Sequence, residues 1–329
     1  MSEEVFTCPR CFFTAPLRDD IRFCPHCGLP DAKEAFLDHA PLEVTVGSRQ
    51  FRVLDRIAIG SISTVYRCKF ASSAGESEGV FKIARDARAN DLIASEARIL
   101  RELHAADTAE RFSPFLPIVE ESLRFDAGPD SPARQANILR MHPEIRSPDE
   151  LYSLLDVKAQ FPSGLDQRDA AWIWRRLLSI LGFIHERQIV HTMVLPMHVM
   201  IEPRGHKLVL IDWCCAQTQL NHQSQVIITG GYRAWYNRFA SGAPLMVTRA
   251  LDIDLAARTM IDLMGGDATS DTLPATVDPA LQRYFQRCLN MKATAADAFR
   301  LLDDFDRLIE TLWGPRKFRV LTLAPKVRG

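Results

Sequence analysis

Four of the eight cysteines form two Cys-x2-Cys pairs near the N-terminus, and their spacing constrains what the first residues can fold into. The pairs are Cys8 with Cys11 and Cys24 with Cys27, separated by twelve residues. This spacing is typical of zinc ribbons, in which four thiolates close a tetrahedron around Zn²⁺ and leave no open position. So short a segment cannot bury a sufficient core without the metal, so we predict a structural zinc site.

An iron site or a redox-active dithiol pair would use the same four cysteines, and these two alternatives stay open beside zinc. His26 is not expected to be a ligand, because four sulfurs already satisfy the metal. We predict the ribbon over residues 1–32 and, from weakly patterned sequence, a linker over 33–48. The remaining cysteines lie singly or adjacent in apolar settings and are expected to be buried thiols: Cys68, Cys214, Cys215 and Cys288.

Composition gives the chain an ordinary globular character. Of 329 residues, 47% are hydrophobic and 25% are charged. Lys and Arg number 40 against 41 Asp and Glu, so charge gives no reason to expect a nucleic-acid partner. The first residues, Met1-Ser2-Glu3-Glu4, lack the basic and apolar regions of a signal peptide, and the apolar stretches are too short and too often interrupted by charge to span a membrane. We therefore expect a cytoplasmic protein that does not enter a membrane.

Alternating apolar residues and turn signals from Arg49 onward predict several strands, of which one contains Lys82. A helix is predicted over 90–103, where apolar residues recur at i, i+3 and i+4. Glu96 falls on its apolar side, and an ion pair with Lys82 would explain that position. Two unrelated surface charges are the alternative. Gly60 lies between the first two strands, where a plain hairpin turn would also account for a glycine.

The first ten residues of the segment 191–201 resemble, without a gap, the His-Arg-Asp-Leu-Lys-Pro-Glu-Asn-Ile-Leu pattern of the protein kinase family. His191 and Pro196 match the pattern. Met193 stands in place of the catalytic aspartate, and His198 replaces the asparagine that binds magnesium. In phosphoryl transfer that aspartate orients the hydroxyl nucleophile and accepts its proton. Methionine can do neither, because a thioether is only a weak acceptor.

Further positions extend the resemblance along the chain. Asp212-Trp213-Cys214 stands for Asp-Phe-Gly, and Lys82 and Glu96 match the kinase lysine and its glutamate partner. Gly60 is the one glycine left in the glycine-rich loop, and Asp252 matches the buried aspartate that anchors the catalytic loop.

The resemblance implies an α+β, bilobal kinase-like fold after the zinc ribbon. Its N-lobe would cover residues 49–143, its C-lobe 144–313, and a basic tail 314–329 would lie as a surface strand on the C-lobe or contact a partner. The resemblance also implies a nucleotide bound through Gly60, Lys82, Glu96 and Asp212, with Mg²⁺ or Mn²⁺ on Asp212. His198 would either join that metal or hold the loop as a polar residue.

These expectations lead to a pseudokinase that binds ATP and acts as a regulatory or scaffolding module for a protein partner. One alternative is an active but atypical ATP-dependent phosphotransferase or nucleotidyltransferase, because phosphoryl transfer depends mostly on positioning and electrostatics. A second alternative is an adaptor whose working part is the zinc ribbon, with the kinase-like region as its platform.

Overall fold

The computed structural model describes residues 5–7, 14–16, 42–72, 75–125, 132–145, 148–218, 230–239 and 247–326. The four predicted zinc ligands, Cys8, Cys11, Cys24 and Cys27, lie outside these ranges. Two short strands flank the first pair of cysteines, and β1 (Val5–Thr7) pairs antiparallel with β2 (Thr14–Pro16). The chain divides into two units, the first containing 1–102 and 118–141 and the second containing 103–117 and 142–329.

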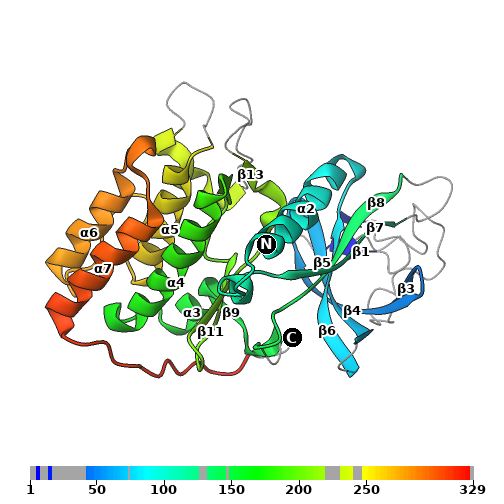
Figure 1. Cartoon of the computed structure of the whole chain (residues 1–329), viewed down its shortest axis with the longest axis horizontal. Helices are drawn as coiled ribbons and strands as arrows, with labels where there is room; N and C mark the ends of the chain where they lie inside the picture. Colours follow the sequence, from blue (N-terminus) through cyan, green and yellow to red (C-terminus); the bar gives the residue numbers. More distant parts are fainter. Residues whose placement is uncertain are drawn as a thin grey trace. The chain divides into compact units, whose positions relative to one another are not determined.

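The first unit is built on a six-stranded antiparallel sheet in the order β3-β4-β5-β6-β8-β7 (Figure 1). Its strands are β3 Leu42–Val46, β4 Arg49–Ile59, β5 Ser63–Ser72, β6 Gly75–Ala84, β7 Ile118–Phe125 and β8 Arg134–Arg140. The 3₁₀ turn η1 (Ala87–Ala89) leads into the long helix α2 (Asn90–Ala106).

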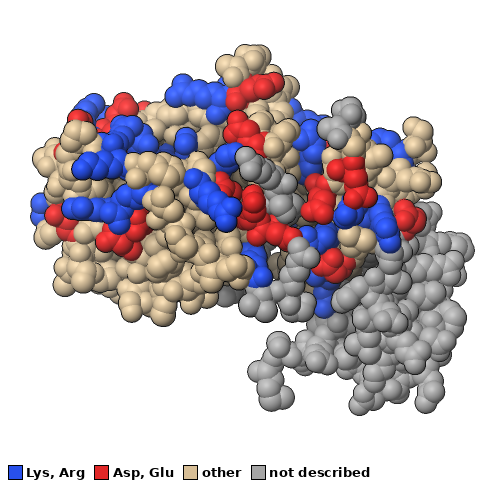
Figure 2. All heavy atoms as spheres, turned by 90° about the horizontal axis from the view of Figure 1, so that it is seen from below, with Lys and Arg blue, Asp and Glu red and all other residues tan. Residues whose placement is uncertain are grey.

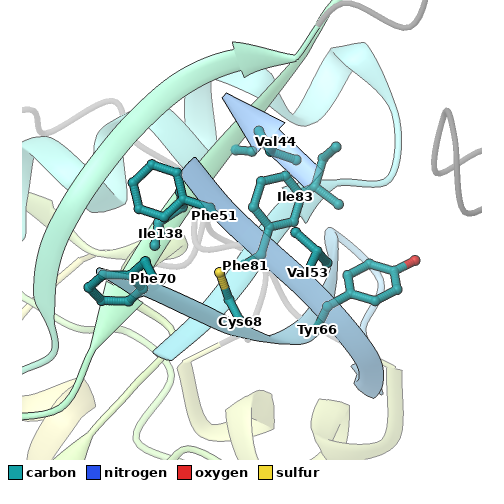
Figure 3. Packing of buried hydrophobic residues seen from close by; sticks show 10 residues of the cluster. Val44, Phe51, Val53, Tyr66, Cys68, Phe70, Phe81, Ile83 and Ile138 are labelled. Carbon is teal, nitrogen blue, oxygen red and sulfur yellow. The ribbon is translucent and has the colours of Figure 1, made fainter. Parts of the chain in front are cut away.

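Alternation along the strands separates the two faces of this sheet. Ten buried residues from five strands form the core of one face, nine of them labelled in Figure 3: Val44, Phe51, Val53, Tyr66, Cys68, Phe70, Phe81, Ile83, Ala136 and Ile138. Phe81 and Ile83 belong to this cluster, so Lys82 between them points to the opposite face. That face meets α2, because Lys82 contacts Glu96 on the helix. The sheet therefore carries Lys82 on its helix-covered side.

Strand β3 lies inside the range 33–48 that the sequence predicts as a linker. It pairs with β4 in a regular register, with Val44 opposite Phe51. Val44 is buried in the sheet core, whereas its neighbours Glu43 and Thr45 are exposed. Five residues at the edge of a weakly patterned segment are too few to reveal this alternation, and the linker prediction is wrong for 42–46.

The second unit is mainly helical (Figure 1). Its helices are α3 Leu154–Gln160, α4 Gln167–Glu186, α5 Arg249–Leu263, α6 Pro279–Leu289 and α7 Ala298–Trp313. The 3₁₀ segments are η2 Ser113–Phe115, η3 Pro148–Glu150, η4 Trp213–Cys215, η5 Gly230–Phe239 and η6 Ala293–Ala295. Short strands form two small sheets, β12-β11-β9 and β10-β13: β9 Tyr152–Ser153, β10 Ile189–Val190, β11 Val199–Glu202, β12 Lys207–Leu210 and β13 Gln217–Thr218.

Side-chain caps fix where the principal helices of this unit begin. Asp166, Thr248, Asp278 and Asp297 each accept a hydrogen bond from a backbone N–H in the first turn of α4, α5, α6 and α7. Helix α5 is buried along almost its whole length, and its buried residues include charged ones, of which Arg258 pairs with Asp254. It can therefore carry a buried aspartate into the middle of the unit.

The tail from Gly314 to 326 has no strand in its described residues, so the predicted surface strand is wrong. It nevertheless lies along its own unit. Arg319 forms an ion pair with Asp169 at 2.5 Å, and the Ala324 N–H donates to Gln160 at 2.7 Å. The basic side chains hold the segment through ion pairs and leave its backbone outside any sheet.

The helices that the structure describes include none long and apolar enough to cross a membrane. The face drawn in Figure 2 shows Lys and Arg side chains interspersed with Asp and Glu over the described residues. This mixture agrees with the near balance of 40 basic and 41 acidic residues.

We expect a pH-dependent contribution to stability from Asp107, which holds the turn before η2. Burial raises the pKa of its carboxyl, but N–H donors of Phe112 and Ser113, both at 2.6 Å, outweigh burial and lower it. A lowered pKa stabilises the fold above the unfolded value of about 4, and this contribution disappears as the pH falls through the folded pKa. The substitution Asp107→Asn should therefore lower the free energy of unfolding by about 1–3 kcal/mol at neutral pH.

Urea unfolding of the Asp107→Asn variant and the wild type at pH 7 and pH 3 measures this contribution. The difference in free energy of unfolding should be large at pH 7 and shrink at pH 3. Asp303→Asn, on the exposed side of α7, is the matched control. An equal difference at both pH values would contradict the assignment.

Candidate functional site

In the first unit, Lys82 and Glu96 form a buried ion pair. Lys82 Nζ lies 2.8 Å from Glu96 Oε1, and the two residues are only 5% and 1% exposed. Strand β6 supplies the lysine and helix α2 the glutamate. The pair that the sequence predicts is thus present, and it fixes α2 against the sheet.

Asn137 completes this pair and was missed by the sequence reasoning. It stands directly opposite Lys82 in the β6–β8 register, and its Nδ2 donates to Glu96 Oε2 at 3.1 Å and to the Ile93 carbonyl at 2.7 Å. Its Oδ1 accepts from the Ser122 hydroxyl at 2.8 Å. Both carboxylate oxygens of Glu96 are therefore occupied. The only sign of this role in the sequence is an asparagine between two apolar residues, and the role becomes clear only from the β6–β8 register.

Gly60 lies in the tight turn between β4 and β5. Its N–H donates to the Ser63 carbonyl at 2.8 Å, and its own carbonyl accepts from Arg85 Nη1 at 3.0 Å. The turn is exposed at Gly60 and Ser61. The structure therefore gives this position the geometry of a hairpin turn, with an arginine fixing its start.

In the second unit, Asp252 on α5 holds the loop that begins at His191. Its two carboxylate oxygens accept the N–H groups of His191 and Thr192 at 2.8 and 2.7 Å. His185 Nε2 lies 3.0 Å from the same carboxylate. Thr192 has φ +68°, a left-handed conformation that costs energy in a β-branched residue. The three contacts to one buried carboxylate offset this cost.

His191 is a neutral, fully buried ring. Burial lowers its pKa to about 4. Its Nε2 faces the Ile211 carbonyl at 3.1 Å, while its Nδ1 accepts from the Met193 N–H at 3.3 Å. The ring edge also meets Trp213, with centroids 4.6 Å apart. His191 therefore ties the loop to the segment around Asp212 and has a structural role.

Met193 occupies the position that the resemblance assigns to the catalytic base. Its side chain is buried, at 1% exposure, and its N–H is bound by His191. Its carbonyl accepts from the Leu195 N–H at 2.8 Å and faces His198 Nδ1 at 2.9 Å. The loop keeps a fixed backbone while the side chain adds only apolar packing.

His198 and Asp212 lie side by side. His198 Nε2 is 3.2 Å from Asp212 Oδ2, and the Cys214 thiol donates to Asp212 Oδ1 at 2.9 Å. Asp212 has the left-handed backbone angles φ 65° and ψ 64° at the start of η4. The structure thus brings together the two residues predicted to share a metal, and it gives each carboxylate oxygen a protein partner.

A divalent cation fits these residues only in part. Within the described ranges, no group of three or more His, Cys, Asp and Glu is arranged to hold a metal ion. Mg²⁺ commonly uses one or two carboxylates together with phosphate oxygens and water. Asp212 can supply one such carboxylate, provided that its contacts with His198 and Cys214 open.

The contact made by Tyr236 is a second feature that the sequence did not reveal. In kinases a glutamate ends the Ala-Pro-Glu motif at this point, and here the sequence is Ala234-Trp235-Tyr236. The buried Tyr236 hydroxyl donates to the Thr192 carbonyl at 3.0 Å, and burial raises its pKa. Thr192 Oγ1 in turn donates to the Cys215 carbonyl at 3.0 Å. The hydroxyl groups of Tyr236 and Thr192 therefore hold the loop in place.

No model of a known protein family matches the chain, and no curated protein matches its sequence. Among solved structures, the crystal structure of the BubR1 kinase domain is similar, with a TM-score of 0.60 and 17% identity over 83% of this chain and 84% of that chain. At this identity the likeness shows the fold alone. The chain has a protein kinase-like fold, which confirms that part of the prediction, whereas the zinc ribbon stays a prediction.

Proposed function

We propose that this chain is a pseudokinase that binds a nucleotide and acts as a regulatory or scaffolding module for a protein partner. The observation that carries the proposal is Met193. A buried thioether at the position of the base can neither orient a hydroxyl nucleophile nor accept its proton. The contacts of Asp252 keep the surrounding loop in place, so the loss concerns chemistry and leaves the fold intact.

Retention of the Lys82–Glu96 pair supports nucleotide binding. Burying two charges is costly, and apolar residues of similar volume often replace such pairs without loss of stability. A kinase-like lysine that still carries its glutamate and an added asparagine therefore favours a retained role in binding phosphate. When bound, Mg²⁺ would neutralise phosphate charge, with Asp212 as its protein ligand.

Calorimetric titration with ATP, with and without Mg²⁺, tests nucleotide binding. We expect saturable binding that Lys82→Arg weakens, because arginine's planar head differs from a lysine ammonium in shape and reach. Asp212→Asn should remove any increase in affinity that Mg²⁺ brings, and Asp303→Asn should leave both titrations unchanged. Absence of binding in both conditions would overturn the nucleotide part and leave a pure scaffold.

An atypical ATP-dependent phosphotransferase or nucleotidyltransferase is the second candidate. It is favoured by the same Lys82–Glu96 pair and by the Asp212 carboxylate, because positioning and electrostatics supply most of phosphoryl-transfer catalysis. The two candidates differ in whether a phosphoryl or nucleotidyl group is transferred from ATP, which labelled ATP can show.

The predicted zinc ribbon offers a separate route to a partner. If the ribbon captures the partner, deletion of residues 1–32 should abolish capture while ATP affinity stays unchanged. If capture survives the deletion, the kinase-like region is the binding surface.

A further inference from the structure

A cavity of about 330 Å³ lies in the second unit, and neither Asp212 nor His198 is among the residues that line it. Helix α4, His206 in the β11–β12 turn, the end of α7 and the first residues of the tail line this half-open cavity. Its volume is that of a small-ligand site, roughly 300–1,000 Å³. Its lining includes Arg168, Trp172, His206, Trp313, Lys317 and Phe318.

The lining contains five basic side chains and no carboxylate. Three of the five are paired with carboxylates just outside: Asp306 holds Arg175 and Arg316 at 2.6 and 2.5 Å, and Asp169 holds Arg319. Arg168 and Lys317 have no ion pair within the described part of the chain, and Arg168 lies over the Trp313 ring at 5.5 Å. The cavity therefore has a surplus of positive charge.

Aromatic rings form the other part of the lining. Trp172 stacks on His206 with centroids 4.4 Å apart, and Phe318 of the tail stacks on the other side of His206 at 4.1 Å. Phe318 is nevertheless 65% exposed.

We infer that this cavity binds a small aromatic anion: a planar ring that carries a carboxylate, sulfonate or phosphate. The anionic group answers the charges of Arg168 and Lys317, which have no ion pair within the described part of the chain, while the ring packs against Trp313 and Phe318. Charge-assisted hydrogen bonds give such a site its affinity, and the aromatic walls give it selectivity for a flat ligand. The inference uses neither Lys82 nor Asp212 and is independent of the proposed nucleotide binding.

Anilinonaphthalene sulfonate, an aromatic sulfonate, tests the inference by fluorescence titration of the full chain, with N-phenylnaphthylamine as the neutral analogue. We expect saturable binding of the sulfonate and weaker binding of the amine. The double variant Arg168→Gln/Lys317→Gln should weaken sulfonate binding by about tenfold or more, since a hydrogen bond to a charged group is worth on the order of a tenfold change. It should leave binding of the amine unchanged.

The double variant Arg283→Gln/Lys292→Gln removes two exposed positive charges outside the cavity and is the matched control for charge. Thermal unfolding of each variant shows that the fold persists. Equal sulfonate affinity in Arg168→Gln/Lys317→Gln and in Arg283→Gln/Lys292→Gln, or equal affinity of the wild type for both probes, would overturn the inference.

Discussion

Asp252→Ala should lower the free energy of unfolding by about 3–5 kcal/mol, because it removes a buried carboxylate that binds two backbone N–H groups and His185. The variant leaves the N–H groups of His191 and Thr192 buried without an acceptor. It also leaves the left-handed conformation of Thr192 without the contacts that offset its cost. Urea denaturation followed by circular dichroism measures the loss.

Asp262→Ala on the same helix is the control for Asp252. Asp262 lies nearer the surface and pairs with Lys158 at 2.5 Å, so its loss should cost no more than about 1 kcal/mol. If both alanine variants unfold at the same urea concentration, the central role given to Asp252 is wrong.

The second large effect is expected at the ion pair of the first unit. Lys82→Met and Glu96→Gln should each destabilise the protein by about 3–5 kcal/mol, because each leaves its partner charged and buried. The double variant should lose much less than the sum, since no unpaired charge remains. Chemical denaturation of the four proteins in this cycle gives the coupling energy.

Arg98 and Glu102 on α2 provide the comparison cycle. Their side chains are more than half exposed and lie 3.6 Å apart, so the coupling energy should be at most about 0.5 kcal/mol. Additive losses at Lys82 and Glu96 would mean that the two residues do not act as a pair in solution.

Much of this site could be predicted because its residues occur in patterns that sequence preserves. Lys82 stands in an apolar strand and Glu96 on the apolar side of a helix, and both positions demand a partner. The ungapped segment from His191 to His198 likewise identified the loop. The fold followed from the same positions, since each belongs to a particular strand, helix or turn of a kinase-like domain.

The missed residues depend on contacts between distant segments. Asn137 acquires its meaning only from the β6–β8 register, and Tyr236 only from its distance to the Thr192 carbonyl. Strand β3 was missed because five residues carry too little alternation to stand out. The prediction of a strand in the tail was wrong because the basic residues of the tail form ion pairs with carboxylates at the surface. Such pairings are fixed by tertiary packing, which local sequence does not encode.

Transfer of label from ATP most directly tests the claim that this kinase-like chain lacks phosphotransfer chemistry. The full chain is incubated with Mg²⁺ or Mn²⁺ and with ATP labelled at either the α or the γ phosphate, beside the Asp212→Ala variant. We predict no incorporation into protein or added substrates and no nucleotide cleavage above the level of that variant. Transfer of either label by the wild type that Asp212→Ala abolishes would contradict the account and establish an active enzyme.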